Sequence, residues 1–142
     1  MAENKFYQMR LIILSVAILL TAGTSTTVLQ DQTRIPAGIS LALKTGNAAE
    51  LSKYMNSTVD LLLIDKQDFY KKTVAETILK DFFNEYQVKD FVIRHQGARN
   101  DAQYAIGDLQ TEKGSLRVYF LLKKVNQDLL IHLIRIEPDI TK

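Results

Sequence analysis

The chain has 142 residues, of which 46% are hydrophobic, and its 18 lysines and arginines nearly balance its 16 acidic residues. This length suits one domain with a short extra segment, and the hydrophobic content is too high for a disordered chain. The near-neutral charge argues against a nucleic-acid-binding protein, which normally carries a basic face or tail. The absence of cysteine excludes disulfides, thiolate nucleophiles and cysteine-based metal sites.

The first 25 residues have the pattern of a secretory signal peptide. Lys5 and Arg10 form a positively charged N-terminal region, and residues 11–20 are apolar. Residues 21–25 supply the small side chains that signal peptidase requires. An uncleaved membrane anchor is the alternative, but the apolar run is shorter than the roughly 20 residues that span a bilayer. We expect cleavage, a loose leader over 26–34, and export, most simply to the periplasm of a Gram-negative bacterium. We expect the protein to be attached to a membrane only if the signal peptide stays uncleaved.

The segment 35–55 predicts two short helices. Pro36 suits the first turn of a helix. Asn47 is a helix cap, and Glu50 stands three residues later, where a capping box places it. The β-branched and apolar stretch 56–65 then predicts a strand.

The clearest helix pattern runs from Asp68 to Tyr86, with Asp68 as its expected N-cap. Its apolar side chains recur every three or four residues, which predicts one buried stripe. These side chains are Ala75, Ile78, Leu79, Phe82, Phe83 and Tyr86.

From Val88 onward the apolar period changes to two. Four strands are predicted, over residues 91–95, 104–109, 116–122 and 129–136, with short turns between them. The order α-α-β-α-β-β-β-β predicts an α+β domain over 35–138, with helices on one face of a curved antiparallel sheet and a tail at 139–142.

Several segments of this domain resemble a known family. They are Leu43–Leu51, Ala75–Phe83, Tyr104–Gly107, Arg117–Lys124 and Arg135–Glu137. With them the chain resembles domain-of-unknown-function family 4783, an uncharacterised family of exported bacterial domains in the nuclear-transport-factor-2-like superfamily.

The resemblance implies a cystatin-like cone in which helices close one side of a bent sheet. Because the superfamily includes isomerases, dehydratases, carriers and dimerisation modules, the fold implies no particular chemistry. It implies that a ligand, such as a small apolar molecule, would bind on the concave side under the helices. At Val74 the family resemblance leads us to expect a polar residue, so any role of that position is absent here.

Three residues are candidates for lining such a pocket. His95 ends a strand on which alternation places it with Phe91 and Ile93, and it is either a pocket base or a histidine at the sheet margin. We prefer the margin, because no orienting partner is identifiable. Tyr104 and Asp108 share a face of the next strand, and the resemblance to ketosteroid isomerases implies proton abstraction there. The alternative, which we prefer, is a solvated Asp108 near a hairpin end.

Neither a metal nor an organic cofactor is expected. His132 lies alone among aliphatic residues, and the sequence offers no third ligand at useful spacing. The basic stretch Arg117–Lys124 is better explained as a strand with charged ends than as a stacking surface for nucleic acid. No phosphate-binding glycine loop and no nucleophile elbow occurs.

The last two predicted strands carry apolar residues on both faces. Strict alternation puts Tyr119, Leu121, Leu130 and Ile134 on a face that the helices do not cover. Such a patch predicts a homodimer or a periplasmic protein partner, unless the tail or the leader covers it.

The sequence therefore favours a non-enzymatic binding or scaffold domain. The alternative is a small-molecule acid/base enzyme of the ketosteroid-isomerase or dehydratase type that uses the cone pocket. A pocket in which a carboxylate and a second polar group converge would favour the enzyme. A cone filled by Phe82, Phe91 and Phe120 would favour the scaffold.

Overall fold

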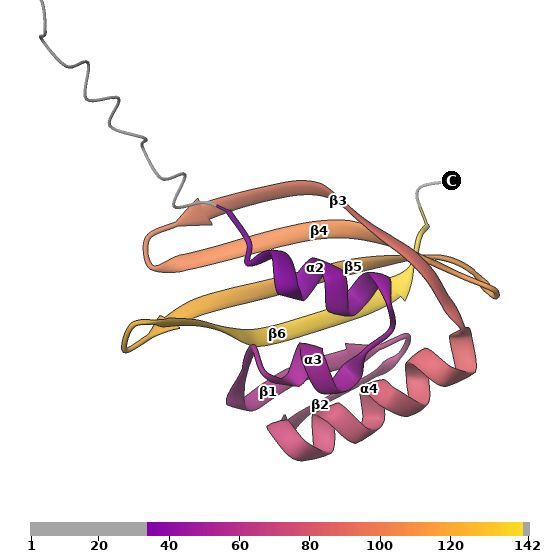
Figure 1. The fold of residues 1–142 in the computed structure, drawn as a ribbon, viewed down its shortest axis with the longest axis horizontal. Helices are drawn as coiled ribbons and strands as arrows, with labels where there is room; N and C mark the ends of the chain where they lie inside the picture. The colour runs from indigo at the N-terminus through magenta and orange to yellow at the C-terminus, as the bar shows by residue number, and fades with distance from the viewer. Residues whose placement is uncertain (1–33, 141–142) are drawn as a thin grey trace, which may run out of the picture. The chain divides into compact units, whose positions relative to one another are not determined.

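The computed structural model describes residues 34–140, in which three helices lie against one six-stranded sheet (Figure 1). The helices are α2 (Ala37–Lys44), α3 (Ala48–Ser52) and α4 (Lys72–Tyr86). The strands are β1 (Met55–Leu63), β2 (Lys66–Lys71), β3 (Val88–Arg99), β4 (Ala102–Thr111), β5 (Gly114–Val125) and β6 (Asp128–Pro138). The expected signal peptide lies outside the described residues. Within them, no helix has both the length and the apolar character needed to cross a bilayer.

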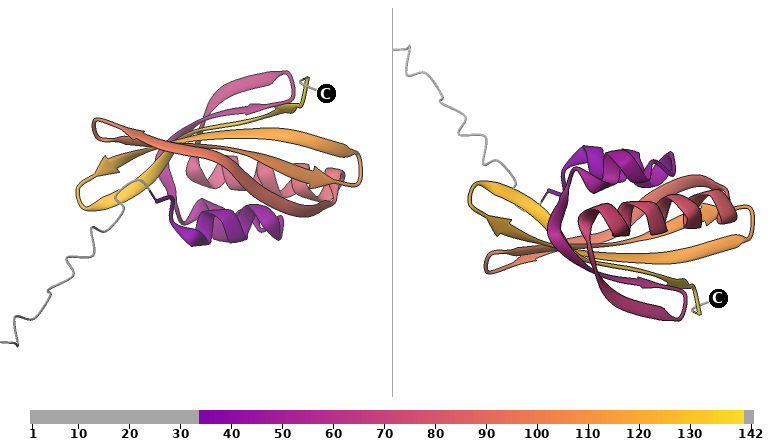
Figure 2. Two further views of the ribbon diagram at one scale, coloured as in Figure 1. Left: turned by 90° about the horizontal axis from the view of Figure 1, so that it is seen from above. Right: turned by 90° about the horizontal axis from the view of Figure 1, so that it is seen from below.

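The strand order is β2-β1-β6-β5-β4-β3. Strands β3 to β6 form the predicted antiparallel meander, and β1 joins it by pairing in parallel with β6, Leu61 opposite Ile134. All three helices lie on one side of the bent sheet, which is plain when it is seen from above and below (Figure 2). This is the α+β arrangement that the sequence predicts.

The core fills the space between the helices and the sheet. Ile39 and Leu43 of α2 and Leu79 of α4 are buried against Phe120 and its neighbours in the sheet. Phe82, Phe91 and Phe120 are 7%, 5% and 0% exposed. Aromatic side chains therefore occupy the side of the sheet on which the sequence suggested a ligand pocket.

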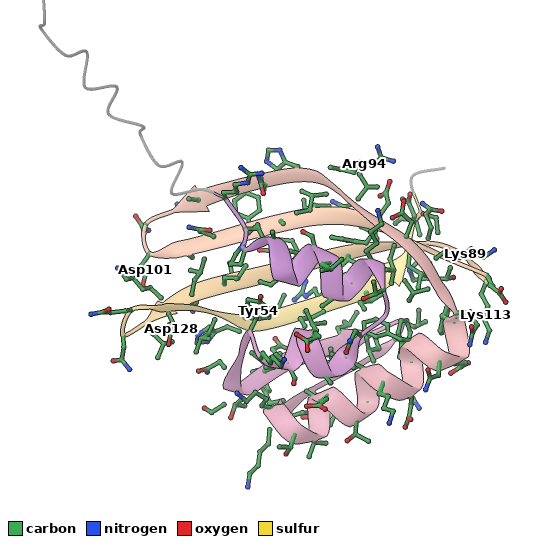
Figure 3. The ribbon with its side chains drawn as sticks, viewed as in Figure 1. Tyr54, Lys89, Arg94, Asp101, Lys113 and Asp128 are labelled. Carbon is green, nitrogen blue, oxygen red and sulfur yellow. The ribbon has the colours of Figure 1, made fainter. Side chains whose placement is uncertain are left out.

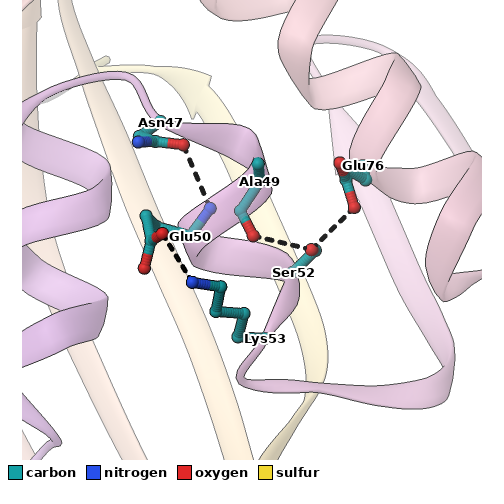
Figure 4. A network of polar contacts seen from close by, with 6 residues as sticks. All are labelled: Asn47, Ala49, Glu50, Ser52, Lys53 and Glu76. Carbon is teal, nitrogen blue, oxygen red and sulfur yellow. Dashed lines mark hydrogen bonds and ion pairs between the residues drawn. The ribbon is translucent and has the colours of Figure 1, made fainter.

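Helix α3 begins as its sequence predicts. Asn47 Oδ1 accepts a 3.0 Å hydrogen bond from the Glu50 amide, the N-cap interaction (Figure 4). Glu50 also forms a 2.6 Å ion pair with Lys53, and this hydrogen bond raises the pKa of Lys53. The cap is a local contact, which is why the sequence pattern is sufficient to find it. The reciprocal contact of a capping box is not formed, because the Asn47 amide donates to the Ala42 carbonyl oxygen and the Glu50 side chain pairs with Lys53.

The prediction that a helix begins at Asp68 is wrong. Residues 66–71 form β2, an edge strand that pairs with β1 through contacts such as Asp60 opposite Phe69. Helix α4 begins at Lys72, after Lys71, whose side chain makes no cap hydrogen bond. Nearly every side chain of β2 is exposed, so the strand has no apolar alternation to mark it. Val74 lies near the start of α4 and is 46% exposed.

Two register shifts overturn predictions that rest on strict alternation. One lies between Ile93 and His95 in β3, so His95 pairs with Ile106 and does not share a face with Phe91. The other lies opposite Leu121 and Leu122 and spans residues 131–133 of β6. It turns Ile134 into the core, where it is 1% exposed, so Ile134 is not on the uncovered face. A bulge adds one residue to a strand and reverses the faces beyond it.

Candidate functional site

Most of the candidate residues lie on the sheet face opposite the helices, here called the outer face. On β4, Ala105 and Leu109 are buried under the helices. Tyr104, Ile106 and Asp108 alternate with the buried positions, point the other way and are half-buried. Register extends this face across the neighbouring strands. Its apolar side chains are Leu62, Tyr104, Ile106, Tyr119, Leu121, Leu130 and Leu133, and its charged ones include Asp108, Arg117, Arg135 and Glu137.

His95 and Tyr104 meet on the outer face at the edge of the sheet. His95 Nε2 and the Tyr104 hydroxyl are 3.2 Å apart, and their ring centroids are separated by 5.7 Å. Gly97 makes room for this contact, because a Cβ there would lie 2.7 Å from the Tyr104 hydroxyl oxygen. The Tyr104 ring continues toward Tyr119, at 6.4 Å between centroids. His95 is exposed on the edge strand β3, which continues to Arg99, so His95 does not end the strand as expected.

Asp108 has a different partner. Its Oδ2 accepts a 2.7 Å hydrogen bond from Arg94 Nε, an ion pair in which the Asp108 side chain is 21% exposed and the Arg94 side chain 63%. Arg94 lies in the β3 register shift, and Figure 3 shows it at the outer edge of the sheet.

The three candidate pocket residues therefore form two separate pairs on the outer face and lie outside the helix-covered cone. Acid/base catalysis needs an acid and a base that converge on one reacting atom. His95 faces Tyr104, and Asp108 faces Arg94. Within residues 34–140, no three histidines or acidic residues gather to hold a metal.

The centre of the outer face is hollowed. An open hollow of about 470 Å³ is lined by Ile106, Arg117, Tyr119, Leu133, Arg135 and Glu137. Its lining combines three apolar or aromatic side chains with three charged ones, and it is open to solvent, unlike an enclosed ligand pocket.

Two more open hollows lie at the margins of the sheet. One lies between the start of α2 and β3, and His95 lines it together with Arg34, Ser40 and Arg94. The other lies between the turns of the β3–β4 and β5–β6 hairpins, next to Asp101 and Lys124. Both are open to solvent, so neither encloses a small molecule.

His132 occupies the register shift of β6 and has a different environment. Its Nε2 atom is buried and has no hydrogen-bond partner among the described residues. Burial lowers the pKa of His132, and the charge of Lys123 lowers it further. The neutral imidazole is therefore the form that the fold accommodates.

Sequence reasoning missed Leu133, Arg135 and Glu137 as outer-face residues. Strict alternation beyond residue 131 would put Leu133 on the helical side, but the register shift of β6 places it opposite Leu121 on the outer face. Arg135 and Glu137 pair across the sheet with Tyr119 and Arg117. Only the register shows that these side chains gather in one hollow.

The chain matches one family profile and several solved structures of the same family. The sequence profile of DUF4783, described as a domain of unknown function, matches residues 36–137. A DUF4783 family protein from Bacteroides ovatus is 39% identical, with a TM-score of 0.73 over 75% of this chain and 97% of its own. One from Bacteroides uniformis is 37% identical, with a TM-score of 0.71 over 75% and 98%. No curated protein matches the chain.

The fold extends to more distant structures. A protein described as "Rd1NTF2_04 with long sheet" is 17% identical, with a TM-score of 0.58 over 70% of this chain and 94% of its own. At this identity the likeness concerns the fold alone. It confirms the nuclear-transport-factor-2-like cone that the sequence segments suggested.

Proposed function

The chain belongs to the DUF4783 family, whose description assigns no function, and we propose that it is an exported, non-enzymatic binding or scaffold domain that docks a protein partner through its outer face. Export is supported by the charged, apolar and small-residue order of the first 25 residues.

The outer face is the observation that carries the docking role. Leu121 and Leu133 are half-buried cross-strand neighbours at its centre, with Tyr119 and Ile106 beside them. The helices lie on the other side of the sheet, so none of them covers these side chains (Figure 2). Contiguous, partly exposed apolar surface with charged side chains beside it is typical of protein interaction sites.

The interior supports a non-enzymatic role. Phe82, Phe91 and Phe120 fill the cone in which a small apolar ligand or a substrate would bind. His95 and Asp108 lie outside it, each with its own partner. This arrangement is the one that favours a scaffold over an acid/base enzyme.

Site-specific photo-crosslinking in the native host tests the proposal. A photoreactive phenylalanine analogue at Leu121 reports contacts of the outer face, and the same analogue at Leu41 is the matched control. Leu41 is apolar and 61% exposed, but it lies on α2, on the helical side. We expect crosslinked protein adducts from Leu121 and few from Leu41. Adducts from Leu41 alone, or from neither position, would contradict docking through the outer face.

A further inference from the structure

The two edges of the sheet differ in what covers them. Strand β3 forms one edge and lies against α2, to which a 3.3 Å ion pair between Lys44 and Asp90 joins it. Strand β2 forms the other edge, and no element of residues 34–140 lies beyond it (Figure 2). Unpaired backbone groups on such an edge can bind a strand of another molecule, so β2 needs a different kind of protection.

The pairing of β1 with β2 determines which backbone groups of β2 point outward. Leu63 pairs with Lys66 across a two-residue turn, and the pair next to such a turn exchanges backbone hydrogen bonds. Bonded and unbonded pairs alternate along an antiparallel ladder. The backbone amides and carbonyls of Gln67, Phe69 and Lys71 therefore point away from β1, toward the free edge.

The central outward amide, that of Phe69, is occupied by a side chain of the same strand. It donates a 2.7 Å hydrogen bond to Asp68 Oδ1, so the residue expected from the sequence to cap a helix binds the strand edge instead. A hydrogen bond to a carboxylate is stronger than one to a neutral carbonyl. An incoming strand must displace the carboxylate before it can pair at Phe69.

The side chains of β2 both create the risk of strand pairing and oppose it. Phe69 is 69% exposed, and its ring adds apolar surface to the free edge. Lys66 and Lys71 stand at the two ends of the strand, are exposed, and belong to no ion pair among residues 34–140. Lysines on an edge disfavour the approach of a second strand, but they leave the centre of β2 to Asp68.

We propose that Asp68 prevents β2 from pairing with the β2 strand of another molecule, because its carboxylate occupies the outward amide of Phe69. This role concerns the sheet edge and is independent of docking through the outer face. Without the carboxylate, two β2 strands pair antiparallel with Phe69 at the centre. Each copy then donates its Phe69 amide to the Phe69 carbonyl oxygen of the other. This two-fold pairing uses both β2 edges, so it stops at two copies.

Hydrogen exchange of the Phe69 amide tests the contact itself. The sample is the purified domain from residue 31 onward, the compact unit of the chain. Related crystal structures match over 97% and 98% of their own length, so the domain folds by itself. Asp68→Ala should accelerate the exchange about tenfold, as expected for the loss of a hydrogen bond to a charged group. Asp68→Asn keeps a side-chain oxygen acceptor and should retain most of the protection.

Sedimentation equilibrium of the same variants tests the consequence. Asp68→Ala should double the mass relative to wild type at the same concentration, whereas Asp68→Asn should keep the wild-type mass. Asp81→Ala removes the same charge at an exposed position of α4 and should also have no effect. Because every mass is compared with that of wild type, association through the outer face does not alter the result.

A second substitution in the Asp68→Ala background locates the new contact. Phe69→Pro removes the outward amide without removing a hydrogen bond to β1, so it should restore the wild-type mass. Phe69→Ala removes the ring but keeps the amide, so the doubled mass should persist. Thermal unfolding checks the fold of each variant, and Gln67→Pro is the second block if Phe69→Pro does not fold.

An Asp68→Ala domain with unchanged exchange at Phe69 overturns the proposal. Faster exchange without a rise in mass also overturns it, since the edge then stays unpaired without the carboxylate. Equal association of Asp68→Asn and Asp68→Ala would show that charge, and not the hydrogen bond, protects the edge. A doubled mass that neither proline substitution reduces would place the contact away from β2 and would likewise contradict the proposal.

Discussion

Ser52 Oγ donates a 2.7 Å hydrogen bond to Glu76 Oε2 and joins α3 to α4 (Figure 4). Ser52 is 7% exposed, and its hydroxyl also lies 2.8 Å from the Ala49 carbonyl oxygen. A hydrogen bond to a carboxylate, shielded from water, contributes more than an exposed one. This hydrogen bond links the side chains of the short helix α3 and of α4, and it stabilises the position of α3 against α4.

Replacing Ser52 by alanine should therefore lower the free energy of unfolding by about 1–2 kcal/mol, because Glu76 loses a buried donor. Urea unfolding measures the change. Lys80→Ala, at an exposed position of the same helix as Glu76, should have little effect. An unchanged midpoint for Ser52→Ala would show that the bond adds nothing to stability.

Gly107→Ala should destabilise the domain by about 1–3 kcal/mol, the usual cost of overpacking. A Cβ at this position would lie 2.6 Å from two ring atoms of Phe91 and from the Val92 carbonyl oxygen. Combining it with Phe91→Leu should give a smaller loss than the sum of the two single changes, since the smaller side chain yields space. If the two losses of stability were strictly additive, contact with the Phe91 ring would not be the cause of the Gly107→Ala effect.

Stability should fall as pH drops through the range in which His132 titrates. The pKa of His132 is lowered in the folded state from its usual 6.5, so the unfolded chain binds the proton first. The contribution of the neutral ring to the free energy of unfolding is therefore fully present above the pKa that His132 has in the unfolded chain. It is lost as the pH falls through the lower pKa that His132 has in the folded domain.

Urea unfolding at several pH values between about 7.5 and 5, near the usual histidine pKa, measures this dependence. His132→Gln should remove part of it, and His95→Gln, at an exposed position, should retain it. Identical pH profiles for wild type and His132→Gln would disprove the assignment.

The N-terminal pattern predicts cleavage between about residues 22 and 26. Protein recovered from the native envelope should begin near Ser25 or Thr26 when its N-terminus is sequenced. Replacing the small residues 21–25 by large ones should block processing. A full-length chain held stably in the inner membrane would favour the anchor instead.

Apolar periodicity was sufficient to locate most elements, because a buried face leaves a repeating pattern. The cap at Asn47 and the stripe of α4 are local in this sense. Strand β2 was not predicted because nearly all of its side chains are exposed, including Phe69, so they show no apolar alternation. A solvated edge strand needs no buried face, so its sequence carries no such pattern.

The faces of His95 and Ile134 could not be predicted for a different reason. Each follows a register shift, and the shift depends on how a strand pairs with its neighbours and not on its own residues. The candidate site moved with them. His95 lies on the outer face and not on the face of Phe91, and Leu133 occupies the outer-face position that was predicted for Ile134.

The parallel pairing of β1 with β6 also determines the order in which the domain can assemble. Strands β3, β4 and β5 are joined by short turns and can associate as soon as they exist. The β1–β2 hairpin enters the sheet only through β6, the last strand of the chain. A chain that ends before Asp128 would leave β1 and β5 as open edges, free to accept strands from other molecules. Loss of the last strand should therefore yield aggregating protein and not a smaller stable domain.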